Sequence, residues 1–260
     1  MRNSTSRPRV AIVIPARLHS TRLPQKLLLR ETGMTVIQHT YEAASRATKA
    51  SRICVAADGE EIAAAVRAFG GNVVLTDPNH ASGSDRVAEV ARDWPDVDII
   101  VNVQGDEPEI SAEAIDQVVG LLEQNPAAVM STLSTPIRTK EKLNDPSCVK
   151  VVFDGQQRAL YFSRSVIPHA RTWHDELLSA EPPHFHQHIG LYAYRRDFLL
   201  KIATLPRPAI EQLESLEQLR VLHAGQTILV GSIAEPSIGI DTPADYQEFV
   251  QRHRQPRRAA

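Results

Sequence analysis

Cysteine and long apolar stretches are scarce in this 260-residue chain, which holds only Cys54 and Cys148. Two cysteines this far apart exclude a disulfide framework and a CxxC metal site. No stretch reaches the roughly 18 apolar residues of a membrane helix. The start, MRNSTSRPR, has no apolar segment behind its charges, so we expect no secretory signal. The sequence therefore predicts a cytoplasmic protein that has no membrane partner.

An excess of one charge sign is also missing, because 29 Lys and Arg stand against 31 Asp and Glu, a net charge of −2. A balanced chain has no global field that would attract nucleic acid, so we expect no nucleic-acid partner. The phosphate-binding patterns GxGxxG and GxxxxGK[ST] do not occur either. If this protein binds phosphates, local clusters of charged side chains must hold them.

Short apolar, β-branched runs are the main structural pattern present. They occur at 10–14, 53–57, 73–75, 99–103, 129–133, 149–153 and 227–230. Helical patterns lie between most of them, at 36–47, at 60–69 and after the N-cap residue Ser111. This alternation predicts a doubly wound, mostly parallel α/β sheet in a single domain spanning 1–260. A more β-rich rhythm over 134–226 predicts a smaller mixed-sheet insertion.

Three cations follow the first predicted strand, in AIVIPARLHSTRLPQK. In open α/β sheets, ligands bind beyond the carboxyl ends of the strands, where Arg17, Arg22 and Lys26 stand. Arg17 can bind two oxygens of one phosphate, and Lys26 can act as a point charge. The alternative is a basic loop in solvent.

Some carboxylates remain unused after the helix caps are assigned. Asp106 and Glu107 follow the strand 99–103 in QGDEP, where Ser111 already caps the next helix. In GIDTP, Thr242 is a good N-cap, which leaves Asp241 unused. Two such acids meeting across the sheet could share one Mg²⁺. Turn acids facing water are the alternative.

Three further stretches carry candidate chemistry. In ALYFSR, Arg164 follows an apolar run and would suit a substrate carboxylate. In HFHQHIG, His184, His186 and His188 would share one face if extended, which could bind a metal although no fourth ligand is indicated. We expect LESLEQLRVLHAG to form one helix, with its charged residues in solvent and four leucines in the core: Leu213, Leu216, Leu219 and Leu222.

Read together, these motifs resemble one family. IPARLHSTRLPQK, NVQGDEP, ALYFSR, LEQLR and GIDTP stand in the order found in the 3-deoxy-manno-octulosonate (Kdo) cytidylyltransferases, the CMP-Kdo synthetases of lipopolysaccharide biosynthesis. The resemblance runs from about residue 9 to 249. It implies a nucleotidyltransferase fold, CTP and Kdo as substrates, Mg²⁺ as cofactor, and a homodimer formed through the insertion.

The resemblance also implies roles for particular residues. Arg17 and Lys26 would be catalytic groups on the CTP phosphates, and Asp106 and Asp241 would be catalytic ligands of Mg²⁺. The nucleotide would contact Ala16, Arg17, Ser20, Lys26, Ser82, Gly83, Arg86 and Gln104. The sugar acid would contact Arg164, His188, Tyr192, Glu217 and Gln218.

The chain departs from the family pattern at three positions. Gln25 and Leu27 replace a glycine and a proline, and Asp85 replaces the glutamate of SGTER. Since no charge is lost, we expect activity to be retained, but the sugar could be an 8-amino-Kdo analogue or a sialic-acid-like acid. Two alternatives stay open: a nucleotidyltransferase for methylerythritol phosphate or a hexose phosphate, and a non-catalytic nucleotide-binding module.

Overall fold

The computed structural model describes residues 8–254. The chain divides into two compact units, the first formed by residues up to Asp116 and from Ser237 onward, and the second by Gln117–Pro236. The first boundary falls within the helix α4 (Ala112–Gln124). The predicted insertion 134–226 falls inside the second unit.

The first unit contains a parallel sheet in the order β3-β2-β1-β4. Its strands are β1 (Val10–Ala16), β2 (Arg52–Ala57), β3 (Val73–Leu75) and β4 (Ile99–Asn102). Residues 10–14 are at most 1% exposed, as expected for a strand that is covered on both faces. The chain leaves β1 toward β2 and later returns to the other side of β1 as β4. The gap between β1 and β4 is therefore the switch point at which ligands bind in such sheets.

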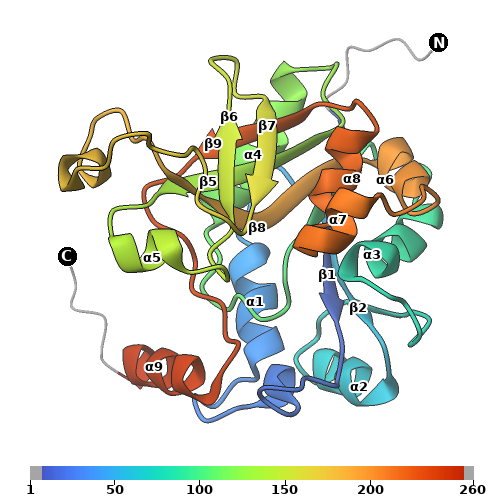
Figure 1. Ribbon diagram of the computed structural model, residues 1–260. Coiled ribbons are helices and arrows are strands. Elements are labelled where there is room, and N and C mark those ends of the chain that lie inside the picture. The colour runs from blue at the N-terminus through green and yellow to red at the C-terminus, as the bar shows by residue number, and fades with distance from the viewer. Residues whose placement is uncertain (1–7, 255–260) are drawn as a thin grey trace. The chain divides into compact units, whose positions relative to one another are not determined.

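Three helices connect these strands, each with a local start or stop signal. Thr35 caps α1 (Val36–Ala44), and Ser82 caps α3 (Gly83–Arg92). The helix α2 (Glu60–Ala68) ends before Gly70, whose φ of +78° favours glycine. Right-handed crossovers put α1 and α3 on opposite faces of this sheet, and both helices contact β1 (Figure 1).

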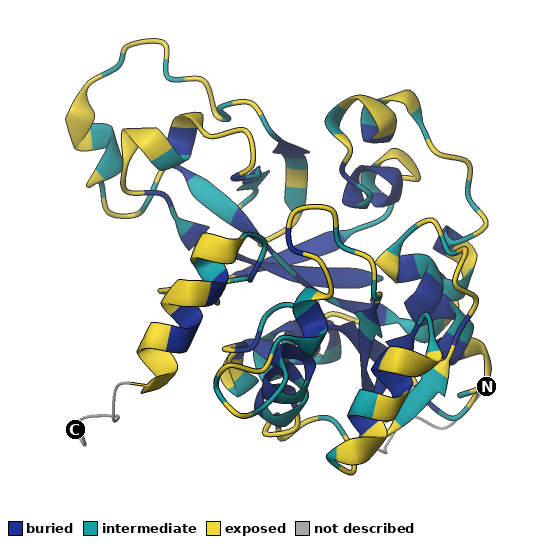
Figure 2. Cartoon of the chain, turned by 90° about the horizontal axis from the view of Figure 1, so that it is seen from below, coloured by how far each residue is buried: buried dark blue, intermediate teal, exposed yellow. Residues whose placement is uncertain are grey.

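The C-terminal helix α9 (Pro243–Arg254) also belongs to the first unit. It begins as predicted, because the Thr242 hydroxyl accepts a hydrogen bond from the backbone N–H of Asp245 at 3.2 Å. Tyr246 and Phe249 are buried on one side of α9 while its other side is exposed (Figure 2). The Tyr246 hydroxyl accepts a hydrogen bond from the backbone N–H of Glu31 at 2.8 Å. Docking of α9 therefore fixes the segment that precedes it, including Asp241, within this unit.

The second unit contains a mixed sheet. The strand β5 (Met130–Pro136) pairs antiparallel with β8 (His186–Arg195) and parallel with β9 (Ile228–Ser232). The strands β6 (Lys150–Phe153) and β7 (Ala159–Ser163) form an antiparallel hairpin (Figure 1). Its helices are α5 (Lys140–Asn144), α6 (Arg196–Ile202), α7 (Ala209–Glu214) and α8 (Gln218–His223). The predicted α/β class with a mostly parallel sheet is confirmed.

The prediction of one continuous helix in LESLEQLRVLHAG is wrong. The helix α7 ends at Glu214, Ser215 has a φ of +51°, and α8 begins only at Gln218. Leu213, predicted for the core, is 85% exposed, whereas Arg220, predicted for solvent, is 4% exposed. The left-handed turn at Ser215 rotates the second half of the segment, so a single helical period cannot describe both halves.

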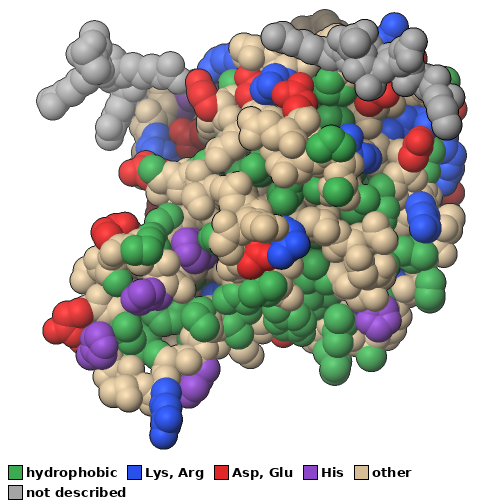
Figure 3. All heavy atoms as spheres, turned by 90° about the horizontal axis from the view of Figure 1, so that it is seen from above, with side chains coloured by type: hydrophobic (Ala, Val, Ile, Leu, Met, Phe, Trp, Pro, Cys, Tyr) green, Lys and Arg blue, Asp and Glu red, His purple; other side chains and the backbone are tan. Residues whose placement is uncertain are grey.

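The surface carries mixed charge. On the face seen in Figure 3, basic and acidic side chains are interspersed, in agreement with the net charge of −2. Within residues 8–254, no helix combines the length and the hydropathy needed to cross a membrane.

Candidate active site

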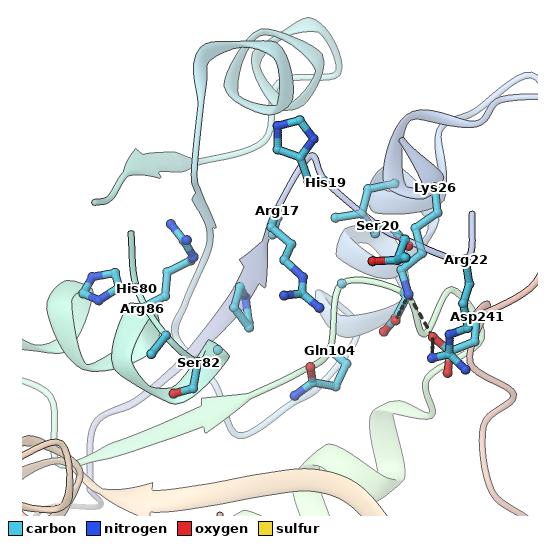
Figure 4. Close-up of a pocket in the computed structure, with 18 residues that line it drawn as sticks. Arg17, His19, Ser20, Arg22, Lys26, His80, Ser82, Arg86, Gln104 and Asp241 are labelled. Carbon is cyan, nitrogen blue, oxygen red and sulfur yellow. Dashed lines mark hydrogen bonds and ion pairs between the residues drawn. The ribbon is translucent and has the colours of Figure 1, made fainter. Parts of the chain in front are cut away.

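A cavity of about 390 Å³ opens in the first unit at the carboxyl ends of β1 and β4. Its walls come from the loop after β1, the segment leading into α3, the loop after β4 and Asp241 (Figure 4). It contains every residue that the sequence predicted for nucleotide or metal: Ala16, Arg17, Ser20, Lys26, Ser82, Gly83, Arg86, Gln104, Asp106 and Asp241. The structure thus brings together two predicted acids that are 135 positions apart in the chain.

The Lys26 ammonium lies at the centre of one wall. Its Nζ donates hydrogen bonds to Asp106 Oδ2, to Asp241 Oδ1 at 3.1 Å and to the carbonyl oxygen of Ile240 at 3.0 Å. The same Asp241 oxygen lies 3.0 Å from Arg22 Nη2. Asp106 and Asp241 therefore converge on one cation. Figure 4 shows the bond between Lys26 and Asp241 as a dashed line.

The atoms around this ammonium fit a hard divalent cation. Two carboxylate oxygens and one carbonyl oxygen face a single point, and oxygen ligands are those that Mg²⁺ prefers. Among residues 8–254, no cluster of three or more His, Cys, Asp or Glu could hold a metal. A set of two carboxylates suits Mg²⁺, which keeps waters and binds substrate phosphates in its other positions. Lys26 and the metal would compete for the same oxygens.

The opposite wall is cationic. The Arg86 guanidinium is buried and donates to the Thr76 hydroxyl. Burial lowers the pKa of Arg86, while the nearby carboxylates of Asp58, Glu89 and Asp77 raise it and the positive charge of Arg17 lowers it further. Arg17 and Arg86 both line the cavity, so this wall can bind an anion.

The helix α3 begins at the edge of the cavity. The Ser82 hydroxyl accepts from the backbone N–H of Asp85 at 3.1 Å and donates to the Asp85 carboxylate at 2.9 Å. The departure from glutamate at position 85 is thus accommodated within the cap. Gly83 lies against the end of β1, where a Cβ atom would meet Pro15 at 3.4 Å.

Sequence reasoning missed His80, which also lines the cavity. Its ring pairs with the carboxylate of Glu89 on α3, and the same carboxylate oxygen accepts from the backbone N–H of Asp77 at 3.1 Å. This pair fastens the segment that leads into α3. The only signal in the sequence is that His80 stands two positions before Ser82, in HASGSDR.

The residues predicted for the sugar acid lie in the second unit. The pairing of β5 with β8 is irregular after Thr132, and such a bulge redirects side chains. The rings of His188 and Tyr192 lie 5.4 Å apart, and the Tyr192 hydroxyl lies 3.5 Å from Gln218 Oε1. Glu217 stands next to Gln218 at the start of α8. Of the five residues predicted for the sugar acid, His188, Tyr192 and Gln218 therefore form one chain of contacts.

Arg164 makes a different set of contacts. Its guanidinium donates to the carbonyl oxygens of Glu214 at 2.7 Å, Pro146 at 3.1 Å and Ser215 at 3.4 Å. These bonds fix the end of α7 beside the loop that follows β7. A role in binding a substrate carboxylate stays a prediction.

Two of the predicted histidines have separate partners. His188 Nε2 lies 3.0 Å from the Thr132 hydroxyl, whereas His186 Nε2 lies 3.1 Å from the carbonyl oxygen of Pro183. The chemistry of His188 is set by burial, because it is 8% exposed.

Burial lowers the pKa of His188 from 6.5 to about 3, so this side chain is neutral in the folded protein at pH 7. The unfolded chain binds a proton at this position below pH 6.5 and the folded protein does not, so stability falls as the pH drops from 7 toward 3. We expect the free energy of unfolding to fall between pH 7 and pH 5 by about 2 kcal/mol more in the native protein than in His188→Gln. Urea unfolding at both pH values measures this difference. Equal losses in the two proteins would contradict a neutral, buried His188.

Comparisons with known proteins agree with this geometry. A family model described as cytidylyltransferase matches residues 11–228. A Rhodopirellula baltica protein named 3-deoxy-manno-octulosonate cytidylyltransferase is 51% identical over 93% of this chain and 97% of its own length. A Shewanella baltica protein named 8-amino-3,8-dideoxy-manno-octulosonate cytidylyltransferase is 44% identical over 94% of this chain and 98% of its own length.

A solved structure is also similar to this chain over nearly its whole length. The structure of CMP:2-keto-3-deoxy-manno-octonic acid synthetase complexed with CTP is similar to this chain with a TM-score of 0.88. The two sequences are 40% identical, and the match covers 95% of this chain and 99% of that one.

Proposed function

We infer a function from the premise that this chain belongs to the cytidylyltransferase family. It transfers the cytidylyl group of CTP to Kdo, which gives CMP-Kdo and pyrophosphate. The observation that carries this conclusion is a cavity in which cations stand on two sides and two carboxylates converge. Such a cavity fits a substrate that carries several negative charges and reacts at phosphorus.

The reaction is an in-line displacement. The anomeric hydroxyl of the sugar acid attacks the α-phosphorus of CTP and releases its proton to solvent. The new P–O bond forms as the bond between the α-phosphorus and the bridging oxygen breaks, and pyrophosphate leaves with that electron pair. Little covalent chemistry falls to the protein, so positioning and charge neutralisation supply the rate. Arg17 binds the phosphates through its planar guanidinium, and Arg86 adds charge on the same side.

Asp106 and Asp241 hold the cofactor in this proposal. Mg²⁺ held by these two acids would supply charge neutralisation at the α-phosphate. Lys26 would then be free of its carboxylate partners, and its ammonium would bind the phosphates of CTP. The convergence of both acids on the Lys26 ammonium supports this exchange.

The sugar acid binds to residues of the second unit: Arg164, His188, Tyr192, Glu217 and Gln218. The neutral ring of His188 and the amide of Gln218 offer hydrogen bonds to sugar hydroxyls without adding charge. Gln218 Nε2 is buried and has no hydrogen-bond partner within the described part of the chain, so it is a donor that a substrate could satisfy. The enzyme acts in the cytoplasm as a homodimer that uses its insertion as the interface, and its product supplies lipopolysaccharide biosynthesis.

A panel of substrates tests this function. Purified protein is incubated with Mg²⁺, with CTP or UTP, and with Kdo, 8-amino-Kdo, sialic acid or a hexose 1-phosphate, and pyrophosphate is measured. We expect release with CTP and Kdo. Release with a hexose 1-phosphate but not with Kdo would overturn the assignment, and CTP binding without turnover on any acid would indicate a non-catalytic module.

The 8-amino analogue of Kdo is the second candidate substrate. The 44% identity to the Shewanella baltica protein named for this analogue favours including it. The ratio of kcat/KM for Kdo to kcat/KM for 8-amino-Kdo decides between the two acids. We expect this ratio to exceed 1, and a ratio below 1 would make the amino sugar the preferred substrate.

Arg164→Ala separates the two substrates. We expect the KM for Kdo to rise by about ten-fold or more, with the KM for CTP changed by less than about two-fold. Because the guanidinium also binds three carbonyl groups, we expect this variant to unfold at a lower temperature. Initial rates at varied CTP and varied Kdo measure both constants. A rise confined to the KM for CTP would move Arg164 to the nucleotide side.

A further inference from the structure

The loop after β1 carries much of the cavity wall but has little backbone support. Five residues of this loop line the cavity: Arg17, His19, Ser20, Thr21 and Arg22. Among the described residues, only one backbone N–H of the segment 17–25 has a hydrogen-bond partner. That group is the N–H of Leu18, directly after Arg17.

The partner of Leu18 is the carboxylate of Asp58. The backbone N–H of Leu18 donates to Asp58 Oδ2 at 3.0 Å and to Asp58 Oδ1 at 3.1 Å. Both oxygens of the acid are thus directed at a single peptide group. Charge-assisted bonds of this kind are about twice as strong as neutral ones.

The register of the sheet explains how Asp58 reaches this position. Ala16 pairs with Ala57 at the ends of the parallel strands β1 and β2. The backbone N–H of Asp58 then donates to the carbonyl oxygen of Ala16 at 3.1 Å, which extends the ladder by one residue. Asp58 therefore stands beside the residue at which β1 becomes the loop. Its backbone is fixed by the ladder, so its side chain can hold the loop.

We propose that Asp58 is a positioning residue for the phosphate-binding loop, which it holds through the peptide that follows Arg17. This proposal rests on the proposed function, because it concerns the binding of the CTP phosphates. Arg17 lies on a loop without glycine in which, among the described residues, no other backbone N–H of 17–25 has a hydrogen-bond partner, so the Asp58–Leu18 contact restricts where the guanidinium can lie. Loss of the contact frees the loop and weakens CTP binding, while the sugar acid binds as before.

A second effect of Asp58 must be distinguished from this one. Its negative charge also raises the pKa of Arg86, so removing the acid changes the field in the cavity as well as the loop. Asp58→Asn separates the two effects, because an amide oxygen still accepts from the Leu18 N–H but carries no charge.

The experiment compares Asp58→Ala, Asp58→Asn and a matched control. Asp116→Ala serves as control, because Asp116 also accepts backbone N–H bonds, from Thr48 at 3.0 Å and Lys49 at 2.9 Å, and neither of these loop residues lines the cavity. We expect Asp58→Ala to raise both the KM and the calorimetric Kd for CTP by about ten-fold or more, with the KM for Kdo changed by less than about two-fold. Asp58→Asn should stay within about three-fold of the native values, and Asp116→Ala should match native kinetics.

The following results would overturn the proposal. An unchanged Kd for CTP in Asp58→Ala assigns the acid a structural role only, and an equal defect in Asp58→Asn assigns the effect to charge. If Asp58→Ala does not fold, Asp58→Val, which keeps the branched shape without an acceptor, replaces it. If neither Asp58→Ala nor Asp58→Val folds but Asp58→Asn does, Asp58 has a structural role only. The native protein is assayed alongside, so absence of CTP binding or of pyrophosphate release there would count against the proposed function instead.

Discussion

Replacing either Asp106 or Asp241 by asparagine is expected to lower kcat for pyrophosphate release by about three orders of magnitude. Each substitution removes one of the two carboxylates that converge on the Lys26 ammonium, and a neutral amide binds Mg²⁺ weakly. Steady-state release of pyrophosphate at saturating CTP and Kdo measures the effect. The loss should be in kcat rather than in the KM for Kdo, since neither acid is proposed to contact the sugar in the ground state.

The fold of these variants should be little affected. When one carboxylate is neutralised, Lys26 keeps the other and the carbonyl oxygen of Ile240. We therefore expect the midpoint of thermal unfolding to change by no more than about 4 °C. Glu109→Gln is the matched control, because Glu109 stands three positions after Asp106 but pairs with Arg252 at 2.8 Å. Near-native kcat in the aspartate variants, or loss of their fold, would contradict the proposed metal site.

The second large effect concerns a buried ion pair between α7 and α8. Arg220 donates to Glu211 Oε2 at 2.7 Å through Nε and to Glu211 Oε1 at 2.5 Å through Nη2, and both residues are less than 8% exposed. Arg220 also donates to the carbonyl oxygen of Ile202 at 3.1 Å. We expect Arg220→Met to lower the free energy of unfolding by about 3–5 kcal/mol, since it leaves the Glu211 carboxylate buried without this partner.

The control for this effect is an exposed pair. Arg67 and Glu60 form an ion pair whose side chains are 52% and 63% exposed, so Arg67→Met should cost less than about 1 kcal/mol. Urea unfolding monitored by circular dichroism measures both variants. Because the pair lies beside Glu217 and Gln218, Arg220→Met should also raise the KM for Kdo. A cost similar to that of Arg67→Met would show that solvent reaches the pair.

Much of the first unit could be predicted from local signals. The strands of its sheet follow short β-branched runs, and α1 and α2 begin where their predicted patterns begin, at Val36 and Glu60. The cavity could be predicted because ligand sites lie at the carboxyl ends of parallel strands. The loops after β1 and β4 both begin at this edge of the sheet. Arg17 and Asp106 can therefore be predicted as site residues from their position directly after a strand.

The second unit was harder to predict because its decisive contacts are not periodic. Glu211 and Arg220 pair across nine positions, whereas helical pairs stand three or four apart. The left-handed Ser215 between them cannot be recognised from residue type, since serine rarely adopts this conformation. The leucine pattern therefore indicated one helix where the structure has two. Asp58 escaped detection for a similar reason, because its partner lies 40 positions away.

The most direct test of the proposed site is anomalous diffraction from crystals grown with CTP and Mn²⁺, which substitutes for Mg²⁺ on oxygen ligands. We expect an anomalous peak within about 2.3 Å of one carboxylate oxygen of Asp106 and one of Asp241, with the Lys26 ammonium moved onto a phosphate oxygen. A peak bound by the triphosphate alone, with Lys26 still between the two acids, would contradict the central claim that these carboxylates share the catalytic metal.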